Sequence, residues 1–181
     1  RVRMLPQLFD VKAADAEVAA DNISATGAEK VWNELKFQGE GIVIAGQDSG
    51  VEWTHPALKN QYRGWNGTKA DHNFNWHDAI HSGGGNPCGT NTKEPCDDHG
   101  HGTHTVGTVV GTDGAANAIG MAPKAKWIAC RNMDEGMGRP STYIECFQWF
   151  LAPWPYGGDP KKDGQPKKAP QKVAQAAASS H

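Results

Sequence analysis

Two short apolar runs, at residues 41–46 and 126–131, constrain the fold of this chain more than any other feature. The first is β-branched at its centre and bounded by glycine, and the second reads Lys-Trp-Ile-Ala-Cys-Arg. Runs of this length and composition are typical of parallel strands that are buried on both faces. We therefore predict a strand at each of them.

Helical patterns follow both strands. Val106, Val109 and Val110 share one face of a predicted helix over residues 101–111, and a second helix is predicted over residues 143–151. The order strand, helix, strand, helix predicts an α/β fold built on a parallel sheet. Residues 52–98 contain many turn signals, and we expect this region to be irregular.

The two ends differ in composition from the middle of the chain. Residues 1–20 are rich in Ala and acidic residues, so we expect a leader, a propeptide remnant or a linker, with a helix between residues 12 and 20. Residues 21–158 form the predicted folded domain. Residues 159–181 are rich in Lys and Ala, and we expect an unstructured tail there.

A further helix is predicted near the start of the folded domain. Thr26 stands three residues before Glu29, which is the spacing of a capping box. Val31, Trp32 and Leu35 then follow at helical spacing.

The charge balance excludes two classes of partner. The chain has 18 basic and 20 acidic side chains, a net charge of −2, which does not fit a strongly basic nucleic-acid binder. No apolar run approaches the roughly 18 residues that a membrane span needs. We expect neither nucleic acid nor a membrane as a partner.

Asp48 and His101 are the candidate catalytic residues that the order of predicted strands and helices indicates. Asp48 ends the first strand and His101 begins the next helix, and ligands of open α/β sheets collect where strands end and helices begin. Glycines at 100, 102 and 107 allow close backbone approach. A carboxylate that binds an imidazole fixes its tautomer and leaves the other ring nitrogen free as a base. The two residues are two thirds of a nucleophile–base–orienter triad.

The segments around these two residues resemble a known family. Residues 44–51 (Ile-Ala-Gly-Gln-Asp-Ser-Gly-Val) and 101–108 (His-Gly-Thr-His-Thr-Val-Gly-Thr) resemble the catalytic Asp and His segments of subtilisin-like serine proteases, the subtilase family. Residues 75–80, 96–101 and 130–133 further resemble the bacillopeptidase F-like branch of that family. The resemblance covers roughly residues 22–153.

This resemblance implies a parallel sheet with helices on both faces, incomplete at its C-terminal end, and the activity of a serine endopeptidase. Asp48 would orient the imidazole, and His101 would act first as general base and then as general acid. The substrate would be a polypeptide, and the chemistry would require no cofactor. The residues that the resemblance places beside the substrate are Asp98, His99, Gly136 and Gly138, with the two glycines on an edge to which a peptide adds as a strand.

The chain as given departs from the family pattern in one respect. It contains neither the Gly-Thr-Ser-like segment with the nucleophilic Ser nor the segment with the oxyanion-hole Asn. Ser179 and Ser180 stand in Ala-rich surroundings without that context. We expect the Asp and His of this chain to need a missing C-terminal half for activity. The alternative is a truncated, catalytically inactive binding module.

The four cysteines of the chain give information on possible disulfides and on the cellular compartment of the protein. Cys88 and Cys96 flank a loop rich in Gly, Pro and Asn, and we predict a disulfide between them. Cys130 and Cys146 fall on a predicted strand and helix, and they either pair or stay as buried thiols. An even number of cysteines in a family of exported enzymes favours an extracellular location, although this chain shows no signal peptide.

Two kinds of metal site stand beside the protease hypothesis. A zinc site would draw on Cys88, Cys96, His99, His101 and His104. A structural calcium ion would take loop carboxylates such as Asp71, Asp78 and Asp97. The sequence singles out no set of calcium ligands.

Overall fold

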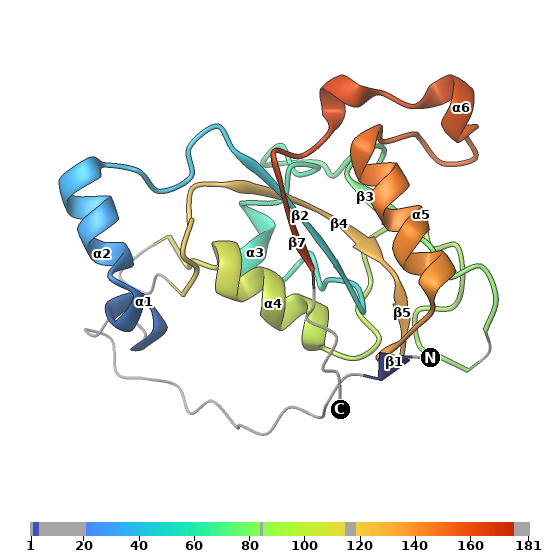
Figure 1. The fold of residues 1–181 in the computed structure, drawn as a ribbon, viewed down its shortest axis with the longest axis horizontal. Coiled ribbons are helices and arrows are strands. Elements are labelled where there is room, and N and C mark those ends of the chain that lie inside the picture. The colour runs from blue at the N-terminus through green and yellow to red at the C-terminus, as the bar shows by residue number, and fades with distance from the viewer. Residues whose placement is uncertain (1, 4–20, 84, 115–118, 176–181) are drawn as a thin grey trace.

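A four-stranded parallel sheet forms the centre of the computed structural model, which describes residues 2–3, 21–83, 85–114 and 119–175 (Figure 1). The strand order is β3-β4-β2-β7. These strands are β2 (Val43–Asp48), β3 (Trp76–Asp78), β4 (Lys126–Arg131) and β7 (Lys172–Gln175). Both strands predicted from the apolar runs are confirmed, although the first lies two residues further along the chain than expected.

A smaller antiparallel sheet and several helices complete the described residues. The small sheet has the order β1-β6-β5, with β1 (Val2–Arg3), β5 (Met133–Asp134) and β6 (Met137–Gly138). The helices are α1 (Asp21–Thr26), α2 (Ala28–Lys30), the π-helix η1 (Val31–Leu35), α3 (Pro56–Lys59), α4 (His101–Val110), α5 (Pro140–Leu151), α6 (Pro160–Asp163) and the 3₁₀-helix η2 (Pro166–Lys168).

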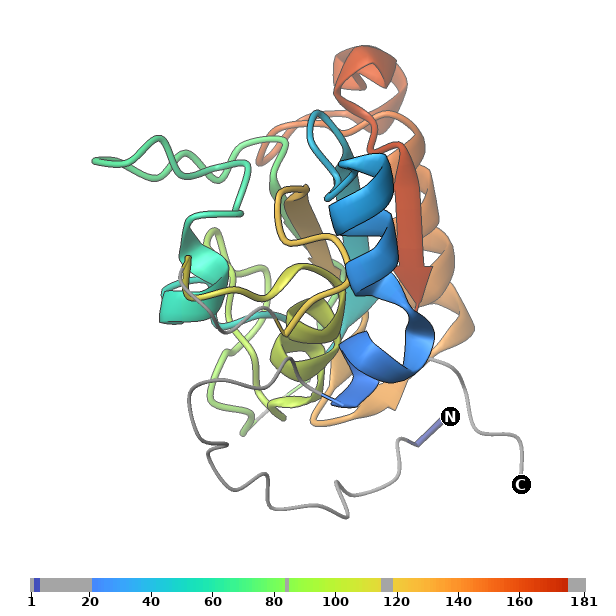
Figure 2. The ribbon, with the colours of Figure 1, turned by 90° about the vertical axis from the view of Figure 1, so that its left-hand side faces the viewer.

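Helices α4 and α5 cover opposite faces of the parallel sheet (Figure 2). Successive side chains of a strand point to opposite faces. On β4, Trp127 therefore packs in the buried cluster that contains Val106 of α4, whereas Ile128 packs in the cluster that contains Trp149 of α5. The α/β fold with helices on both faces of the sheet is confirmed.

Two of the three crossover connections between the parallel strands have opposite hands. The first runs from β3 through α4 to β4, and the second runs from β4 through α5 to β7. Both connections move in the same direction across the sheet, yet their helices lie on opposite faces. One of them is therefore left-handed, which is rare among parallel β-α-β units.

The region 52–98 contains more regular structure than expected. It includes α3 and the strand β3, whose three residues pair with residues 129–131 of β4. A helix of four residues and a strand of three are too short to show a period in the sequence, so the prediction that this region is irregular is wrong for residues 56–59 and 76–78.

The capping prediction for Thr26 is also wrong. Thr26 ends α1, and its hydroxyl donates to the Asn22 carbonyl at 2.7 Å. Gly27 takes the N-cap position of α2 with a φ of 72°, which glycine adopts without strain and a β-branched residue resists. The helical pattern itself is confirmed, but Val31 and Leu35 are exposed.

The expectation of an unstructured tail is wrong for residues 159–175. Residues 172–175 form β7, which pairs in parallel with residues 44–47 of β2. An edge strand is held mainly by backbone hydrogen bonds, so its polar side chains hide it in the sequence. The predicted leader and its helix lie outside the described residues, apart from residues 2–3. Within the described part of the chain, no helix has the length and apolar content of a membrane span.

Candidate functional site

Asp48 and His101 lie in direct contact at the carboxyl edge of the parallel sheet. Asp48 is the last residue of β2, and His101 is the first residue of α4. The ring Nδ1 of His101 lies 2.9 Å from Oδ2 and 3.0 Å from Oδ1 of Asp48. The Asp48 side chain is 3 % exposed and that of His101 is 24 % exposed. The Nδ1–H group therefore donates to a buried carboxylate, and the half-buried ring keeps Nε2 for another partner.

Two further donors fix the orientation of the Asp48 carboxylate. The backbone N–H of Ser49 donates to Oδ1 at 2.7 Å, and the Thr105 hydroxyl, whose single proton is shared with the Gly102 carbonyl at 3.0 Å, lies 3.2 Å from Oδ2. Each oxygen thus has a donor besides the imidazole. A buried carboxylate held in this way is ready to stabilise an imidazolium beside it.

Glycines make this contact possible at two positions. A Cβ at Gly102 would lie 2.0 Å from the Gly50 carbonyl oxygen and 3.1 Å from the Asp48 Cβ, so only glycine lets α4 begin this close to β2. Gly100 adopts a φ of 83° at the N-cap of α4. Gly107, by contrast, faces open space, so the expectation of close backbone approach is wrong there.

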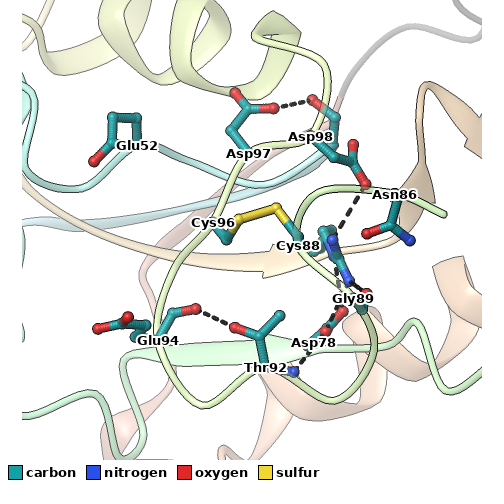
Figure 3. Close-up of a disulfide and its surroundings, with 12 residues drawn as sticks. Glu52, Asp78, Asn86, Cys88, Gly89, Thr92, Glu94, Cys96, Asp97 and Asp98 are labelled. Carbon is teal, nitrogen blue, oxygen red and sulfur yellow. Dashed lines mark hydrogen bonds and ion pairs between the residues drawn. A yellow bond between two sulfur atoms is a disulfide. The ribbon is translucent and has the colours of Figure 1, made fainter.

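The Asp98 carboxylate is buried, and its predicted role beside the substrate stays a prediction. Its Oδ2 pairs with Arg131 Nη1 at 3.1 Å, and neither side chain is exposed. Arg131 also binds both oxygens of Asp78 at 3.0 Å and donates to the Gly89 carbonyl in the disulfide loop. Figure 3 shows Asp78, Gly89 and Asp98 gathered around the Cys88–Cys96 disulfide. Burial raises the pKa of the Asp98 carboxyl to about 6, against the lowering effects of the Glu135 backbone and of Arg131.

Sequence reasoning missed Arg131. Its position in the strand register, directly beside Asp48, places a positive charge at the carboxyl edge of the sheet. An arginine that ends an otherwise apolar strand was the available signal, because a buried cation needs carboxylate partners.

His99 lies close both to His101 and to Gly136, one of the two predicted edge glycines. The His99 ring is exposed, with its centre 6.4 Å from that of His101. A Cβ at Gly136, in the turn between β5 and β6, would lie 3.1 Å from the His99 ring. Gly138 belongs to β6, where a Cβ would lie 2.4 Å from the Tyr143 ring. The substrate roles of these residues stay predictions.

The cysteines all form disulfides. Cys88 pairs with Cys96, as predicted, and Cys130 pairs with Cys146, which resolves the alternative left open by the sequence. The zinc hypothesis is therefore wrong, because two of its ligands are consumed in a disulfide. No group of three or more His, Cys, Asp or Glu side chains among the described residues is arranged to hold a metal ion.

The carboxylates considered for calcium differ in what they bind. Asp78 is committed to Arg131, and Asp97 accepts hydrogen bonds from three residues of its own segment and from Ser49. Asp71 accepts the backbone N–H of Asn73 at 3.0 Å. The calcium site stays a prediction without a ligand set.

A second group of titratable side chains links the end of β3 to α5. Glu145 Oε1 lies 2.7 Å from His77 Nε2 and 2.8 Å from His81 Nε2, and Asn91 Oδ1 lies 2.6 Å from His81 Nδ1. Although burial acts in the opposite sense on each, these hydrogen bonds leave the pKa of His81 raised and that of Glu145 lowered. The arrangement favours an imidazolium–carboxylate pair between the two elements.

Comparisons with known proteins agree with this geometry. The model of the subtilase family matches residues 39–162. The chain is 37 % identical over 174 residues to Bacillopeptidase F of Bacillus subtilis (strain 168), which covers 91 % of this chain and 11 % of that protein. It is 33 % identical over 140 residues to the Minor extracellular protease Vpr of the same strain, covering 70 % of this chain and 15 % of Vpr.

A more distant relative is the Major intracellular serine protease of Bacillus subtilis (strain 168), with 25 % identity over 164 residues. That alignment covers 90 % of this chain and 44 % of the relative, so the chain spans less than half the length of each of these three proteins. The family match covers more than half of the chain and includes both Asp48 and His101. The chain therefore belongs to the subtilase family of serine proteases.

Proposed function

We propose that this chain supplies the base and its orienting carboxylate to a serine endopeptidase whose nucleophile lies on a segment outside this sequence. The observation that carries the proposal is the contact of 2.9 Å between His101 Nδ1 and the buried Asp48 carboxylate. With Nδ1–H bound to Asp48, Nε2 takes the proton of a serine hydroxyl as that oxygen attacks the substrate carbonyl. Asp48 stabilises the resulting imidazolium, which then protonates the leaving amine.

The substrate of this enzyme would be an extended peptide that adds to the edge of β6. Residues 2–3 of the chain itself pair with β6 as an antiparallel strand, Val2 opposite Gly138 and Arg3 opposite Met137, which supports this edge as a site of strand addition. The His99 ring lies close to both that edge and His101, with its centre 6.4 Å from that of His101 and with a Cβ at Gly136, beside β6, 3.1 Å from the ring.

A further segment is needed to complete the enzyme. A cavity of about 340 Å³ opens beside His101, and its wall includes Gln47 of β2, Val109 of α4 and Ala174 of β7. β7 pairs with β2 alone among the described strands. The outer side of α5 exposes a row of apolar side chains, Ile144, Phe147 and Leu151. An open cavity, a free strand edge and an uncovered apolar row are typical of surfaces that pack against more protein.

We place the enzyme outside the cell. The Cys130–Cys146 disulfide ties β4 to α5, the Cys88–Cys96 disulfide closes the loop before α4, and disulfides persist in oxidising compartments. The relatives named above include both an extracellular and an intracellular protease, so this assignment depends on the disulfides.

The alternative is a binding module that keeps the cleft without the chemistry. It is favoured by the sequence itself, which holds the Asp and His segments but no segment for the nucleophile or the oxyanion-hole Asn. The coding frame beyond His181 distinguishes the two proposals. A continuation with a Gly-Thr-Ser segment supports the enzyme, and a stop codon there with stable accumulated protein supports the module.

A fluorophosphonate probe tests the enzyme directly, because it reacts only with an activated serine. The 181-residue chain alone should not be labelled, and the product of a continued frame should be labelled. His101→Ala in that longer product should abolish labelling, since losing the histidine of such a triad costs on the order of 10⁶ in kcat, the magnitude known for subtilisin itself. His104→Ala, three residues further along the same helix, is the matched control and should leave labelling intact. Stoichiometric labelling of the short chain would refute the proposal.

A further inference from the structure

Asp97 has a carboxylate that accepts five hydrogen bonds. Its Oδ1 accepts from the Ser49 hydroxyl at 2.8 Å and from the backbone N–H groups of His99 and Gly100 at 3.1 and 2.8 Å. Its Oδ2 accepts from the backbone N–H and the hydroxyl of Thr103 at 2.8 and 2.5 Å. These donors come from two segments that are far apart in the sequence, the loop after β2 and the start of α4.

Each end of this arrangement adjoins one member of the proposed catalytic pair. Ser49 directly follows Asp48, and Thr103 lies two residues after His101. The Ser49 hydroxyl also accepts the backbone N–H of Gly102 at 3.0 Å. The two segments that carry Asp48 and His101 are thus joined by a closed set of hydrogen bonds, which we call the Asp97 clamp.

A helix cap alone does not account for the clamp. Gly100, at the N-cap of α4, has no side chain, so Asp97 supplies the acceptor for the free N–H groups of the first turn. A negative charge there is also favoured by the helix dipole. A cap of this kind needs contacts to α4 only, whereas the bond to Ser49 adds a link to β2. The same carboxylate therefore caps the helix and fixes its start relative to the strand.

We propose that Asp97 is the positioning residue of the Asp48–His101 pair, holding the His101 ring at hydrogen-bonding distance from the carboxylate through Ser49 and Thr103. The inference rests on the proposed function, because it concerns the geometry of that same pair. It assigns Asp97 no contact with substrate. Any loss of the clamp should weaken the Nδ1–H bond to Asp48 before it unfolds the sheet.

The strength of the hydrogen bond from His101 to Asp48 can be measured on the Nδ1–H proton itself by NMR. In a ¹⁵N-histidine-labelled chain, a ring N–H bound to a buried carboxylate gives a signal far downfield of the backbone amides and exchanges slowly with water. Asp97→Ala should broaden this signal and speed its exchange about tenfold or more, since hydrogen bonds to a charged group contribute about 1.5–3 kcal/mol. Asp97→Asn keeps the shape but loses acceptors, so its effect should be smaller. The amides of β4 should exchange as in the wild type.

Asp159→Ala is the matched control, because Asp159 caps α6 by accepting the Lys161 N–H at 2.9 Å, away from the pair. It should leave the His101 signal unchanged. If Asp97→Ala fails to fold, Asp97→Asn decides the question. Unchanged exchange in Asp97→Asn and in any folded Asp97→Ala overturns the positioning role, and so does a uniform acceleration of all amides. A wild-type chain with no such downfield signal would instead contradict the Asp48–His101 pair and with it the proposed function.

Discussion

Helices α4 and α5 cover opposite faces of one sheet but are attached to it by different means. The start of α4 is held by directional hydrogen bonds, those of the Asp97 clamp and the one from Thr105 to Asp48. α5 is attached by the Cys130–Cys146 disulfide and by Glu145, which binds His77 of β3 and His81 just after it. The chain thus uses covalent and ionic links where a helix only has to stay in place. It uses directional hydrogen bonds at the start of α4, where the His101 side chain has to be oriented toward Asp48.

Removing the packing of α5 should give the largest effect. Trp149 is fully buried in the cluster that joins α5 to the sheet, whereas Leu151, two residues later, is 74 % exposed. Trp149→Ala should lower the free energy of unfolding by about 3–5 kcal/mol, because it leaves a cavity. Leu151→Ala should change it by no more than about 0.5 kcal/mol. Urea denaturation followed by circular dichroism measures both, and similar effects would mean that α5 packs through another face.

Removing each disulfide in turn should distinguish an effect on the free energy of unfolding from an effect on the orientation of the His101 ring. Replacing Cys130 and Cys146 by Ala removes a cross-link between residues 16 apart, which contributes about 3 kcal/mol in the chain-entropy description. Replacing Cys88 and Cys96, which are 8 apart, should cost slightly less, about 2.5 kcal/mol.

Only the second pair adjoins the Asp97 clamp, since Asp97 directly follows Cys96. The Cys88/Cys96 double variant should therefore speed exchange of the His101 ring proton, and the Cys130/Cys146 double variant should not. If both double variants speed the exchange of that proton equally, the proposed difference between the attachment of α4 and that of α5 is wrong.

The Glu145 cluster should give the smallest effect, and one that depends on pH. The pKa of His81 is raised above its ordinary 6.5, so its contribution to stability is present below pH 6.5 and is lost as the pH rises through the folded-state value. The pKa of Glu145 is lowered below 4.5, so its contribution is present above pH 4.5 and is lost as the pH falls through its folded-state value.

Glu145→Gln should therefore be most destabilising between about pH 4.5 and 6.5, by about 1 kcal/mol or less because His81 is half exposed. Urea denaturation of both proteins across this range measures it. Asn91→Ala, which removes only the outer partner of His81, should show a weaker version of the same profile. A constant difference between wild type and Glu145→Gln at all pH values would contradict an ionic attachment of α5.

Local sequence patterns were enough to predict the central elements of the fold and the Asp48–His101 pair at the edge of the sheet. β2 and β4 are apolar on both faces, and α4 shows a helical period, so each could be predicted from its own residues. Asp48 and His101 lie at the boundaries of these elements, which is why their contact followed from the element order. The Cys88–Cys96 pair followed from a short loop.

The features that were missed depend on partners far away in the chain. β7 is a strand because its backbone pairs with β2, some 128 residues earlier, and nothing in its polar side chains shows this. Arg131 and Asp97 look like ordinary charged residues until the fold brings Asp78, Asp98 and Ser49 to them. A sequence shows residue types and their spacing. The hydrogen bonds and ion pairs of Arg131 and Asp97 depend on which residues the fold brings together, so they could not be predicted.

The opposite hands of the two crossovers have a consequence for oxidative refolding. The same strands and helices also permit a competing threading in which both connections are right-handed and α4 occupies the face that α5 takes in the native protein. In that competitor α5 stays on its own face, so the closed Cys130–Cys146 bond acts against it only by fixing α5 there and leaving less room for α4 on the same face. We therefore expect a chain refolded with this bond intact to reach a larger native fraction than the reduced chain.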